Sequence, residues 1–586
     1  MSDDAPNGTA TGEDGTRRRW LGPLVKPLRP IFAEIAATSL FINVLALAVP
    51  VFVLQVYDRV VLYAGFTTLQ GLAIGMLFAI AFDFVLRQSR SRLLQRVALR
   101  FDLAMGQRLF DKLLAVPLRT LETRTAAYWH ALFRDTETVR NAFSGGAAVL
   151  LADLPFAVIF LAFMFVIAQP VAWVILLMLP VFLFVAWRAA SVLRRANSAE
   201  RAVGYGRDAL VTELIAGRTT VKALATGPAL RPLWEDRQTG AIEHAIDRGG
   251  KTDRYVNMSA GLTVFTTVLL TTVGAIAIVN KELTIGALIA ANILSFRIVG
   301  PFQQLVGNWR NLVSAKEASG RLGEAFALAE DRQADAVTAE RPKGKLAFEN
   351  LTFSHEDEGP PAVDQLNVKM GPAGMLGIVG RNGSGKSTLL KLALGLYAPR
   401  KGRVLLDDAD IAQYSRAQLA EWIGYVPQEC VLFAGTIRSN LAQRDALAGD
   451  EEIVRAAKAA GVHGYVVDLP DGYDTDIGEA GARLSAGIRQ RIAIARALVG
   501  DPPVVLLDEP SSNLDRQAQD ELTRSLAALA RTHTVLVVTH SPVLLGACGH
   551  IMAMENGKLA MAGPAADVLG RLFPNPPTPF PEKRSA

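Results

Sequence analysis

The first half of the chain contains six apolar stretches, and they restrict its fold more than any other feature. A helix that crosses a bilayer needs about 20 apolar residues. Six stretches reach or approach that length: Ile31–Val56, Thr68–Leu86, Gly146–Ala168, Val171–Trp187, Ser259–Val279 and Thr284–Val306. We expect the charges within them, Glu34 and Arg297, to face the bundle interior or to lie near a helix end. Buried helices of a large soluble protein are the alternative, but six stretches in one half of the chain favour a membrane domain.

Charge placement predicts the orientation of these spans. Eleven lysines and arginines lie within 87–141 and twelve within 188–255, whereas the connections near 57–66, 169–170 and 280–282 contain almost none. The positive-inside rule assigns both basic segments, and with them the N-terminus and the second half of the chain, to the cytoplasm. The polar first 19 residues lack the apolar region of a signal peptide. The net charge of +5 is small for 586 residues and favours no nucleic-acid partner.

The two basic segments predict long helices. Arg87–Asp111 and Ser191–Gly217 have helical composition with few breakers, so we expect them to continue the membrane helices into the cytoplasm. Arg134–Arg140 and Leu214–Lys222 fall where such helices would turn back and could dock onto another domain. A solvated charged face is the other interpretation of each segment.

The second half of the chain has a different pattern. After an alanine-rich, charged helical linker at 315–344, short strands alternate with helices from Leu346 on, which predicts an α/β domain with a largely parallel sheet. The only two cysteines, Cys430 and Cys548, exclude a disulfide framework or a four-cysteine metal site.

A phosphate-binding loop is predicted in this domain. Gly380–Thr388 fits the pattern G-x-x-x-x-G-K-[ST], after an expected strand at Met375–Val379 and before an expected helix at Leu389–Tyr397. Backbone N–H groups of such a loop and of the helix N-terminus surround phosphates, so the chain is expected to bind a nucleoside triphosphate. Lys386 would reach the β- and γ-phosphates, and the Ser387 hydroxyl would hold Mg²⁺. The expected nucleotide-binding residues of the loop are Gly380, Arg381, Asn382, Gly383, Ser384, Gly385, Lys386, Ser387 and Thr388.

Further candidate residues follow apolar strands. Pro503–Glu509 reads as a buried strand ending in Asp508, placed to hold Mg²⁺, and Glu509, placed to polarise the attacking water. His540 follows the expected strand Thr534–Thr539 and is placed to contact the γ-phosphate, although a single histidine is more often structural. Gln428 could complete the Mg²⁺ shell or be a surface glutamine.

A second anion-binding segment is expected at Leu484–Arg496. It opens with small residues and continues as a basic amphipathic helix, whose free N-terminal N–H groups would bind an anion. The phosphate-binding loop already surrounds the phosphates of its own site. The second segment therefore indicates contact with a γ-phosphate held by another subunit.

In this order the motifs resemble those of ATP-binding cassette (ABC) transporters, over about residues 30–570. Six spans ahead of one cassette resemble a half-transporter with the type I ABC exporter fold, an all-α six-helix transmembrane domain fused to an α/β P-loop ATPase domain. The family works as a dimer with two ATP molecules between its cassettes. ATP binding switches the membrane domains from inward- to outward-facing, and hydrolysis resets them.

The resemblance implies a role for each motif residue. Thr475–Glu479 resembles the loop that senses the partner's coupling helix. The implied roles are Walker A for Lys386 and Ser387, Walker B for Asp508, catalytic base for Glu509, switch histidine for His540, Q-loop for Gln428, D-loop for Asp515, and the signature for Ser485, Ala486 and Gly487.

Three residues depart from the family pattern. In the usual signature Leu-Ser-Gly-Gly-Gln, Ala486 replaces the first glycine and Ile488 replaces the glutamine, whereas Ser485 and Gly487, expected to face the γ-phosphate, are kept. Ala486 is tolerable if its φ is negative. Ile488 loses a hydrogen-bonding group, which predicts weaker nucleotide contact in trans and higher ATPase activity for Ile488→Gln. His355 stands where the family has an adenine-stacking tyrosine, and imidazole can still stack with less area.

The membrane half resembles type I secretion ATPases. Asn43–Pro50 with Leu54–Val60, and Gly286–Leu294 with Pro301, are the similar segments. The resemblance implies a bacterial inner-membrane protein that exports polypeptides together with a membrane-fusion adaptor and an outer-membrane tunnel protein. Because only about 30 residues precede the first span, the N-terminal peptidase domain of some relatives is not expected.

Several alternatives remain open at this point. The chain could form a homodimer or half of a heterodimer, and it could export lipids or small molecules instead of protein. A non-transporting regulator is disfavoured by intact Glu509 and His540. The expected division is a cytoplasmic tail at 1–29, a transmembrane domain at 30–314, a linker at 315–344, a nucleotide-binding domain at 345–570 and a proline-rich tail at 571–586.

Overall fold

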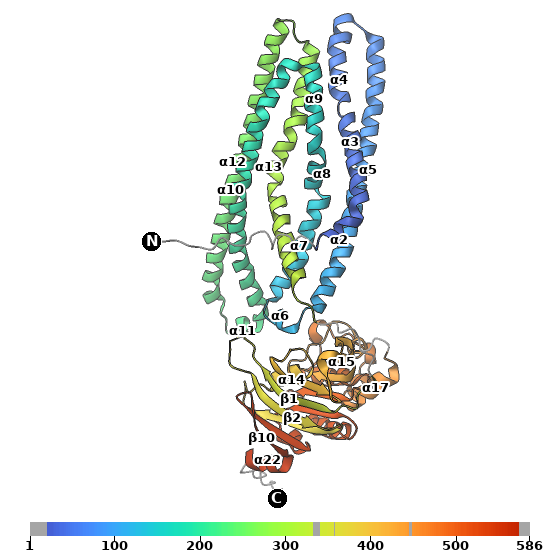
Figure 1. Ribbon diagram of the computed structural model, residues 1–586, viewed down its shortest axis with the longest axis vertical. Helices are drawn as coiled ribbons and strands as arrows, with labels where there is room; N and C mark the ends of the chain where they lie inside the picture. The colour runs from blue at the N-terminus through green and yellow to red at the C-terminus, as the bar shows by residue number, and fades with distance from the viewer. Residues whose placement is uncertain (1–19, 332–339, 357, 445–447, 573–586) are drawn as a thin grey trace, which may run out of the picture. The chain divides into compact units, whose positions relative to one another are not determined.

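The computed structural model describes residues 20–331, 340–356, 358–444 and 448–572 (Figure 1). Most of the two expected tails therefore lies outside the described residues. The chain forms two compact units. The first lies within Met1–Ala115 and Arg124–Ala329, and the second combines the short segment Val116–Thr123 with residues from Glu330 onward.

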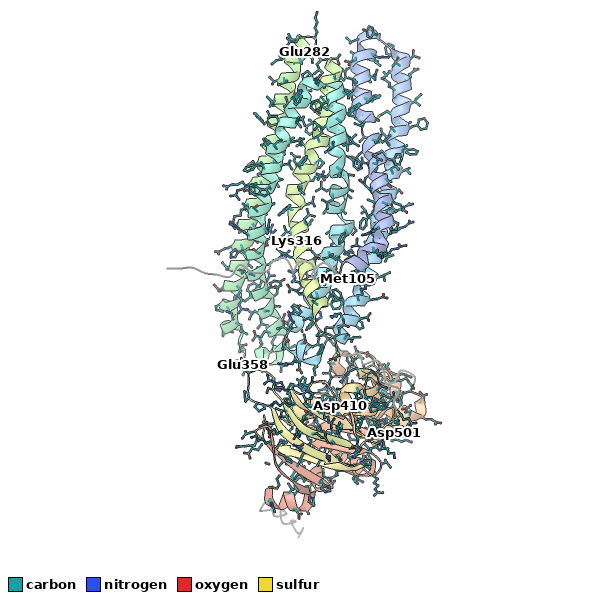
Figure 2. All side chains as sticks on the ribbon, viewed as in Figure 1. Met105, Glu282, Lys316, Glu358, Asp410 and Asp501 are labelled. Carbon is teal, nitrogen blue, oxygen red and sulfur yellow. The ribbon has the colours of Figure 1, made fainter. Side chains whose placement is uncertain are left out.

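The first unit is entirely helical. Six of its helical segments are long and apolar enough to cross a membrane, which confirms the expected number of spans. Its elements are α2 (Gly22–Val25), η1 (Lys26–Leu28), α3 (Arg29–Leu45), α4 (Ala48–Gln55), η2 (Val56–Val61), α5 (Phe66–Ala115), α7 (Ala126–Ser144), α8 (Gly146–Asp153), η3 (Leu154–Phe156), α9 (Ala157–Ile167), α10 (Gln169–Ala216), α11 (Arg218–Ala223), α12 (Gly227–Val279) and α13 (Ile285–Ala327). Glu282 lies in the turn before α13 at one end of the bundle, and Lys316 lies well toward the other end of that helix (Figure 2).

The predicted helical extensions are present. Helix α5 has 50 residues and α10 has 48, so each continues through its basic segment without a break. The expected turn at Arg134–Arg140 is wrong, because these residues lie inside α7. The chain turns back earlier, at Pro117 and helix α6 (Leu118–Glu122), where the proline begins a new short helix. The expected turn at Leu214–Lys222 is correct, since α10 ends at Ala216 and α11 follows.

The expected linker at 315–344 also needs correction. Helix α13 continues past residue 314 to Ala327. Ala318, Leu322 and Ala325 are at most 1% exposed and join a hydrophobic cluster with residues of α5 and α7. Their spacing of four and three residues follows one face of a helix, so this alanine-rich segment packs within the helical unit.

Helices of the membrane unit are joined by polar contacts. Arg90 on α5 donates to Asp153 (2.7 Å) and to the Ser39 hydroxyl (3.1 Å), and Asn43 on α3 donates to the same carboxylate (3.1 Å). A buried charge is stable only with such partners. Asp58, in the π-helical turn η2, accepts hydrogen bonds from the Thr284 hydroxyl (2.6 Å) and the Gly286 N–H (3.0 Å) at the start of α13.

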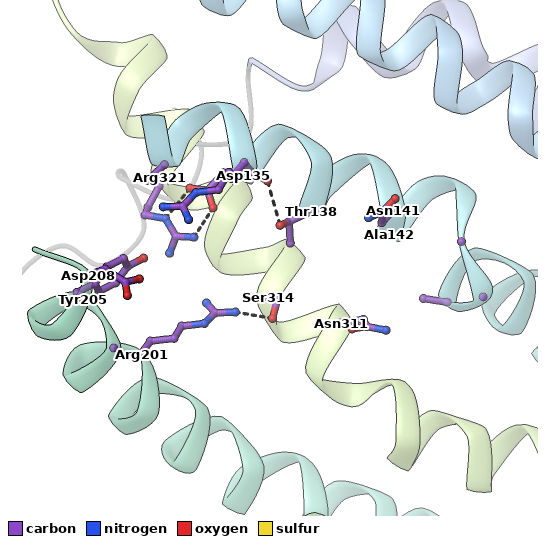
Figure 3. Close-up of a pocket in the computed structure, with 16 residues that line it drawn as sticks. Asp135, Thr138, Asn141, Ala142, Arg201, Tyr205, Asp208, Asn311, Ser314 and Arg321 are labelled. Carbon is purple, nitrogen blue, oxygen red and sulfur yellow. Dashed lines mark hydrogen bonds and ion pairs between the residues drawn. The ribbon is translucent and has the colours of Figure 1, made fainter. Parts of the chain in front are cut away.

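A polar cavity of about 630 Å³ lies between α7, α10 and α13, whose side chains line it (Figure 3). Arg321 on α13 forms two hydrogen bonds with Asp135 on α7, at 2.6 and 2.7 Å. Arg201 on α10 pairs with Glu317 and Ser314 on α13. These contacts attach α13 to both neighbouring helices around the cavity.

The second unit contains two sheets, as the alternating pattern predicts. The four-stranded sheet has the order β2-β1-β4-β5 and is antiparallel. The six-stranded sheet has the order β10-β9-β3-β8-β7-β6, and only its β10–β9 pair is antiparallel. The strands are β1 (Leu346–Phe353), β2 (Val363–Met370), β3 (Gly374–Gly380), β4 (Lys401–Leu406), β5 (Ala409–Asp410), β6 (Ile423–Val426), β7 (Val504–Asp508), β8 (Thr534–Val538), β9 (His550–Glu555) and β10 (Lys558–Pro564).

Helices cover both faces of the six-stranded sheet. All residues of β7 and β8 are buried, which explains their unbroken apolar sequence. One hydrophobic cluster packs between the two sheets together with α14 and α15, and another packs on the opposite face under α17, α19 and α20. The helices are α14 (Lys386–Ala393), η4 (Ile411–Gln413), α15 (Arg416–Trp422), α16 (Ile437–Leu441), α17 (Asp450–Ala459), α18 (His463–Val467), η5 (Gly472–Asp474), η6 (Glu479–Gly481), α19 (Ala486–Leu498), α20 (Arg516–Leu529), α21 (Pro542–Gly546) and α22 (Ala565–Leu572).

Candidate nucleotide site

The candidate site lies at the carboxyl ends of four neighbouring strands. Strands β3, β8, β7 and β6 are parallel, so the segments that follow them meet at one edge of the sheet. These segments are the phosphate-binding loop after β3, His540 after β8, Asp508 and Glu509 at the end of β7, and Gln428 after β6. Open parallel sheets bind ligands at this edge.

The phosphate-binding loop requires its glycines. Gly383 and Gly385 have φ values of +82° and +95°, which favour glycine. A Cβ on Gly385 would lie 2.1 Å from the Ala362 carbonyl oxygen. Helix α14 begins directly at Lys386, three residues earlier than expected, and ends near Gly395, whose φ is +67°.

The loop has the chemistry that a phosphate needs. Lys386 Nζ donates to the carbonyl oxygens of Gly380 (2.8 Å) and Arg381 (2.9 Å), and among the described residues it forms no ion pair with a carboxylate. Burial lowers the pKa of Lys386, while Glu509 and Asp508 oppose that shift. The buried hydroxyl of Ser384 has no hydrogen-bond partner in the part of the chain that the structure describes. An anion in the loop would supply acceptors for both side chains.

Asp508 and Ser387 are positioned together. Asp508 is 3% exposed at the end of β7, and the Ser387 hydroxyl lies near enough to lower the pKa of its carboxyl group. Burial raises the pKa of Asp508, and Ser387 and Lys386 lower it in part. A carboxylate beside a hydroxyl offers the hard oxygen ligands that Mg²⁺ prefers, and these two side chains fit that ion.

Glu509 and His540 form the reactive end of the site. Their side chains approach to 3.5 Å between His540 Nε2 and Glu509 Oε1. Glu509 has a φ of +49°, an uncommon conformation for a residue with a side chain and one found at functional sites. Burial raises the pKa of Glu509, while the positive charge and the backbone hydrogen bond of His540 lower it. The carboxylate is therefore a stronger base than an ordinary glutamate.

His355 lies beside the loop in an aromatic cluster. Its ring packs edge-to-face against Phe353 and Tyr397, at 5.2 and 5.7 Å between ring centroids. Its Nε2 lies 3.3 Å from the Thr388 hydroxyl. The exposed imidazole is thus attached to the first turns of α14.

Three other predicted parts of the site, Gln428, the start of α19 and Asp515, form no described hydrogen bond with the phosphate-binding loop, Asp508 or Glu509 of the same chain. The exposed side chain of Gln428 forms no hydrogen bond with the described residues. Ser485 caps α19 by accepting from the Ile488 N–H (3.3 Å), and Asp515 caps α20 by accepting from the Ala518 N–H (2.8 Å). Ser485 and Ala486 are exposed, which leaves the start of α19 accessible to another molecule.

Two family comparisons cover most of the chain. Residues 32–302 match the family of ABC transporter transmembrane regions, and residues 363–512 match the ABC transporter family. The toxin RTX-I translocation ATP-binding protein of Actinobacillus pleuropneumoniae is 32% identical over 94% of this chain and 78% of its own length. The exotoxin translocation ATP-binding protein of Pasteurella aerogenes is 32% identical over 94% and 77%. The chain is an ABC exporter.

A solved structure supports the same fold. The structure of a bacterial Atm1-family ABC exporter with ATP bound superimposes with a TM-score of 0.81, at 22% identity over 93% of this chain and 96% of that one. Together, the two family matches and the relatives at 32% identity show that the exporter is a multi-pass membrane protein with one cassette that couples ATP hydrolysis to export.

Sequence reasoning missed the residues by which α6 packs on the cassette. The exporter's Glu122 accepts from Tyr397 Oη (2.5 Å) and Lys391 Nζ (2.8 Å). Arg119 donates to the carbonyl oxygen of His355 (2.8 Å), and Leu118 packs against the core between the sheets. Helix α6 thus contacts both the aromatic cluster and the helix that begins with Lys386. Only the proline before α6 signals this helix in the sequence.

The altered signature is compatible with the exporter's local structure. Ala486 is the first residue of α19 and has a negative φ, so its methyl group causes no backbone strain. At Gly487 a Cβ would lie 3.1 Å from the Asn513 carbonyl oxygen, which favours glycine there. Ile488 is half-buried and packs against the hydrophobic core beneath α19, a packing role that the sequence pattern did not indicate.

Proposed function

We propose that the exporter moves polypeptides across the bacterial inner membrane as the permease and ATPase of a type I protein secretion system. The observation that supports this function is the 32% identity, over nearly the whole chain, to proteins named for toxin and exotoxin translocation. The same proposal places the cassette and both termini in the cytoplasm. It predicts two partners, a membrane-fusion adaptor protein and an outer-membrane tunnel protein.

For hydrolysis we propose the following roles. Lys386 and the loop N–H groups bind the β- and γ-phosphates, and His355 packs against the adenine. Ser387 and Asp508, with Gln428, hold Mg²⁺, which when bound neutralises charge on the phosphates. Glu509 accepts the proton of the attacking water, and His540 orients the γ-phosphate and lowers the pKa of Glu509.

We further propose that each site is completed by a second subunit. Ser485, Ala486 and Gly487 lie at the exposed start of α19, and no described contact joins them to the phosphate-binding loop of their own chain. Their N–H groups would bind the γ-phosphate held by a partner, with Asp515 beside the interface. A homodimer satisfies this geometry, and a heterodimer with a related half-transporter would also satisfy it.

Comparison of secreted proteins tests the function. Cells with the wild-type exporter, with Lys386→Ala and with the surface control Lys458→Ala would be compared. We expect a small set of polypeptides to be missing from the medium only with Lys386→Ala. An unchanged set of secreted proteins, together with ATPase activity stimulated by lipids or small molecules, would contradict protein export and favour the alternative exporter.

A further inference from the structure

Arg297 lies close to the middle of a membrane span. The part of helix α13 from Ile285 to Leu305 is long and apolar enough to cross a membrane, and Arg297 is 12 residues from the start of the helix. At 1.5 Å per residue this is about 18 Å along the helix. The hydrocarbon core is about 30 Å thick, so the interface is about 15 Å from its centre. The distance from Arg297 to the interface exceeds the length of an arginine side chain. The guanidinium of Arg297 therefore cannot reach the interface by extending through the lipid.

Arg297 also faces away from the helices of its own chain. Ser295 and Val299, on the opposite face of α13, are 3% and 2% exposed and thus buried, whereas Arg297 is exposed. Gln304, seven residues further and on the same helical face, is exposed as well. The Arg297 side chain forms no hydrogen bond or ion pair with the described residues. Of the two locations expected for Arg297, the interior of its own chain's bundle does not apply because the residue is exposed, and a helix end does not apply because α13 extends from Ile285 to Ala327.

The acidic residues at membrane depth already have partners. Asp58 binds Thr284 and Gly286, Asp83 pairs with Arg87 (2.6 Å) and Asp153 pairs with Arg90 (2.7 Å). Glu34 lies five residues after the start of α3, near the cytoplasmic end of its span. Among the described residues, a second copy of the chain thus offers no carboxylate without a partner at the depth of Arg297. The Arg297 side chain cannot face lipid either, because an unpaired charge at the bilayer centre requires water or a polar partner.

We propose that Arg297 from each of two copies faces a water-filled translocation pathway and binds carboxylate side chains of the polypeptide in transit. The inference rests on the proposed export of polypeptides for the identity of the ligand. A guanidinium binds carboxylates through two parallel hydrogen bonds. Such contacts are weakened by the surrounding water, so a passing chain can bind and leave. Arg297 is then a residue that favours acidic over basic cargo segments.

Cysteine labelling tests whether Arg297 faces water. The two native cysteines lie in the cassette, and burial raises the pKa of Cys430 to about 11 and of Cys548 to about 12, so both react slowly. The purified exporter in nanodiscs would be treated with a charged, water-soluble thiol reagent. We expect Arg297→Cys to react at least tenfold faster than the buried control Ala291→Cys. Equal, slow labelling of both would overturn the pathway.

Protection by peptides tests the ligand. The reporter is Gln304→Cys, labelled in the presence of a soluble peptide of alternating aspartate and glycine or of its asparagine counterpart. We expect the acidic peptide alone to slow labelling several-fold, and Arg297→Gln in the reporter to abolish this protection. Arg297→Lys should retain part of it. Protection that is equal with both peptides, or that survives Arg297→Gln, would overturn carboxylate binding. The Lys386→Ala secretion test decides separately whether the natural cargo is polypeptide.

Discussion

Removing the Glu122 carboxylate is expected to weaken the packing of α6 on the cassette by a measurable amount. Glu122 accepts two hydrogen bonds, from Tyr397 and Lys391. A hydrogen bond to a charged group contributes about 1.5–3 kcal/mol when buried. The side chains of Glu122 and Lys391 are 44% and 28% exposed, so solvent screens the ion pair. We therefore expect Glu122→Ala to cost about 1–2 kcal/mol, which is about a 5- to 30-fold increase in local opening.

Hydrogen exchange of the α6 backbone amides in the purified exporter measures this opening directly. Glu122→Gln, which keeps an acceptor but no charge, should have a smaller effect, and the exposed control Glu358→Ala should have none. Although burial acts to raise it, hydrogen bonds from Lys391 and Tyr397 lower the pKa of Glu122 below its ordinary value. The contact is therefore present at neutral pH and is lost as the pH falls through that lowered value. Unchanged α6 exchange in Glu122→Ala would show that the Glu122 carboxylate does not hold α6 on the cassette.

Three further predictions follow from single positions. Gly385→Ala should destabilise the cassette by about 3 kcal/mol, because the added Cβ would meet the Ala362 carbonyl and the residue has a positive φ. The distorted phosphate-binding loop should also lose its binding of a fluorescent nucleotide. Gly286→Ala should lower the melting temperature of the exporter, because its Cβ would lie 2.6 Å from Asp58 Oδ1, whereas Gly71→Ala, in open space, should not. His540→Ala should move the acid limb of the ATPase pH profile to higher pH, because His540 lowers the pKa of Glu509; a limb at unchanged pH would contradict this electrostatic role.

The structure brings the phosphate-binding loop, Asp508 and His540 to one edge of the sheet because these residues follow parallel strands. An apolar run followed by a polar residue marks the carboxyl end of each strand, and parallel strands bring these ends together. The phosphate-binding loop, Asp508 and His540 were recognisable for this reason. The six spans were predicted from length and hydropathy, and their number is confirmed.

The contacts that the sequence did not indicate, and the predictions that the structure corrects, concern packing between distant segments. The contact of Glu122 with Lys391 joins residues 269 positions apart, and no local pattern indicates it. The alanine-rich start of the expected linker packs inside the helical unit because small side chains allow close approach of α13, α5 and α7. Arg297 was expected to face the bundle interior or to lie near a helix end, but it is exposed within α13, because the neighbouring helices decide which face of α13 is buried and periodicity alone does not identify them.

If ATP hydrolysis at this site drives polypeptide export, then Glu509→Gln, which removes the proposed base, should stop export without removing the bound nucleotide. In membrane vesicles that contain this variant, we predict ATP binding close to wild type, with hydrolysis lowered about 10²- to 10⁴-fold, the usual contribution of a general base. The polypeptides that depend on Lys386 for secretion should then remain untransported. Their export at the wild-type rate, with hydrolysis abolished, would contradict the account.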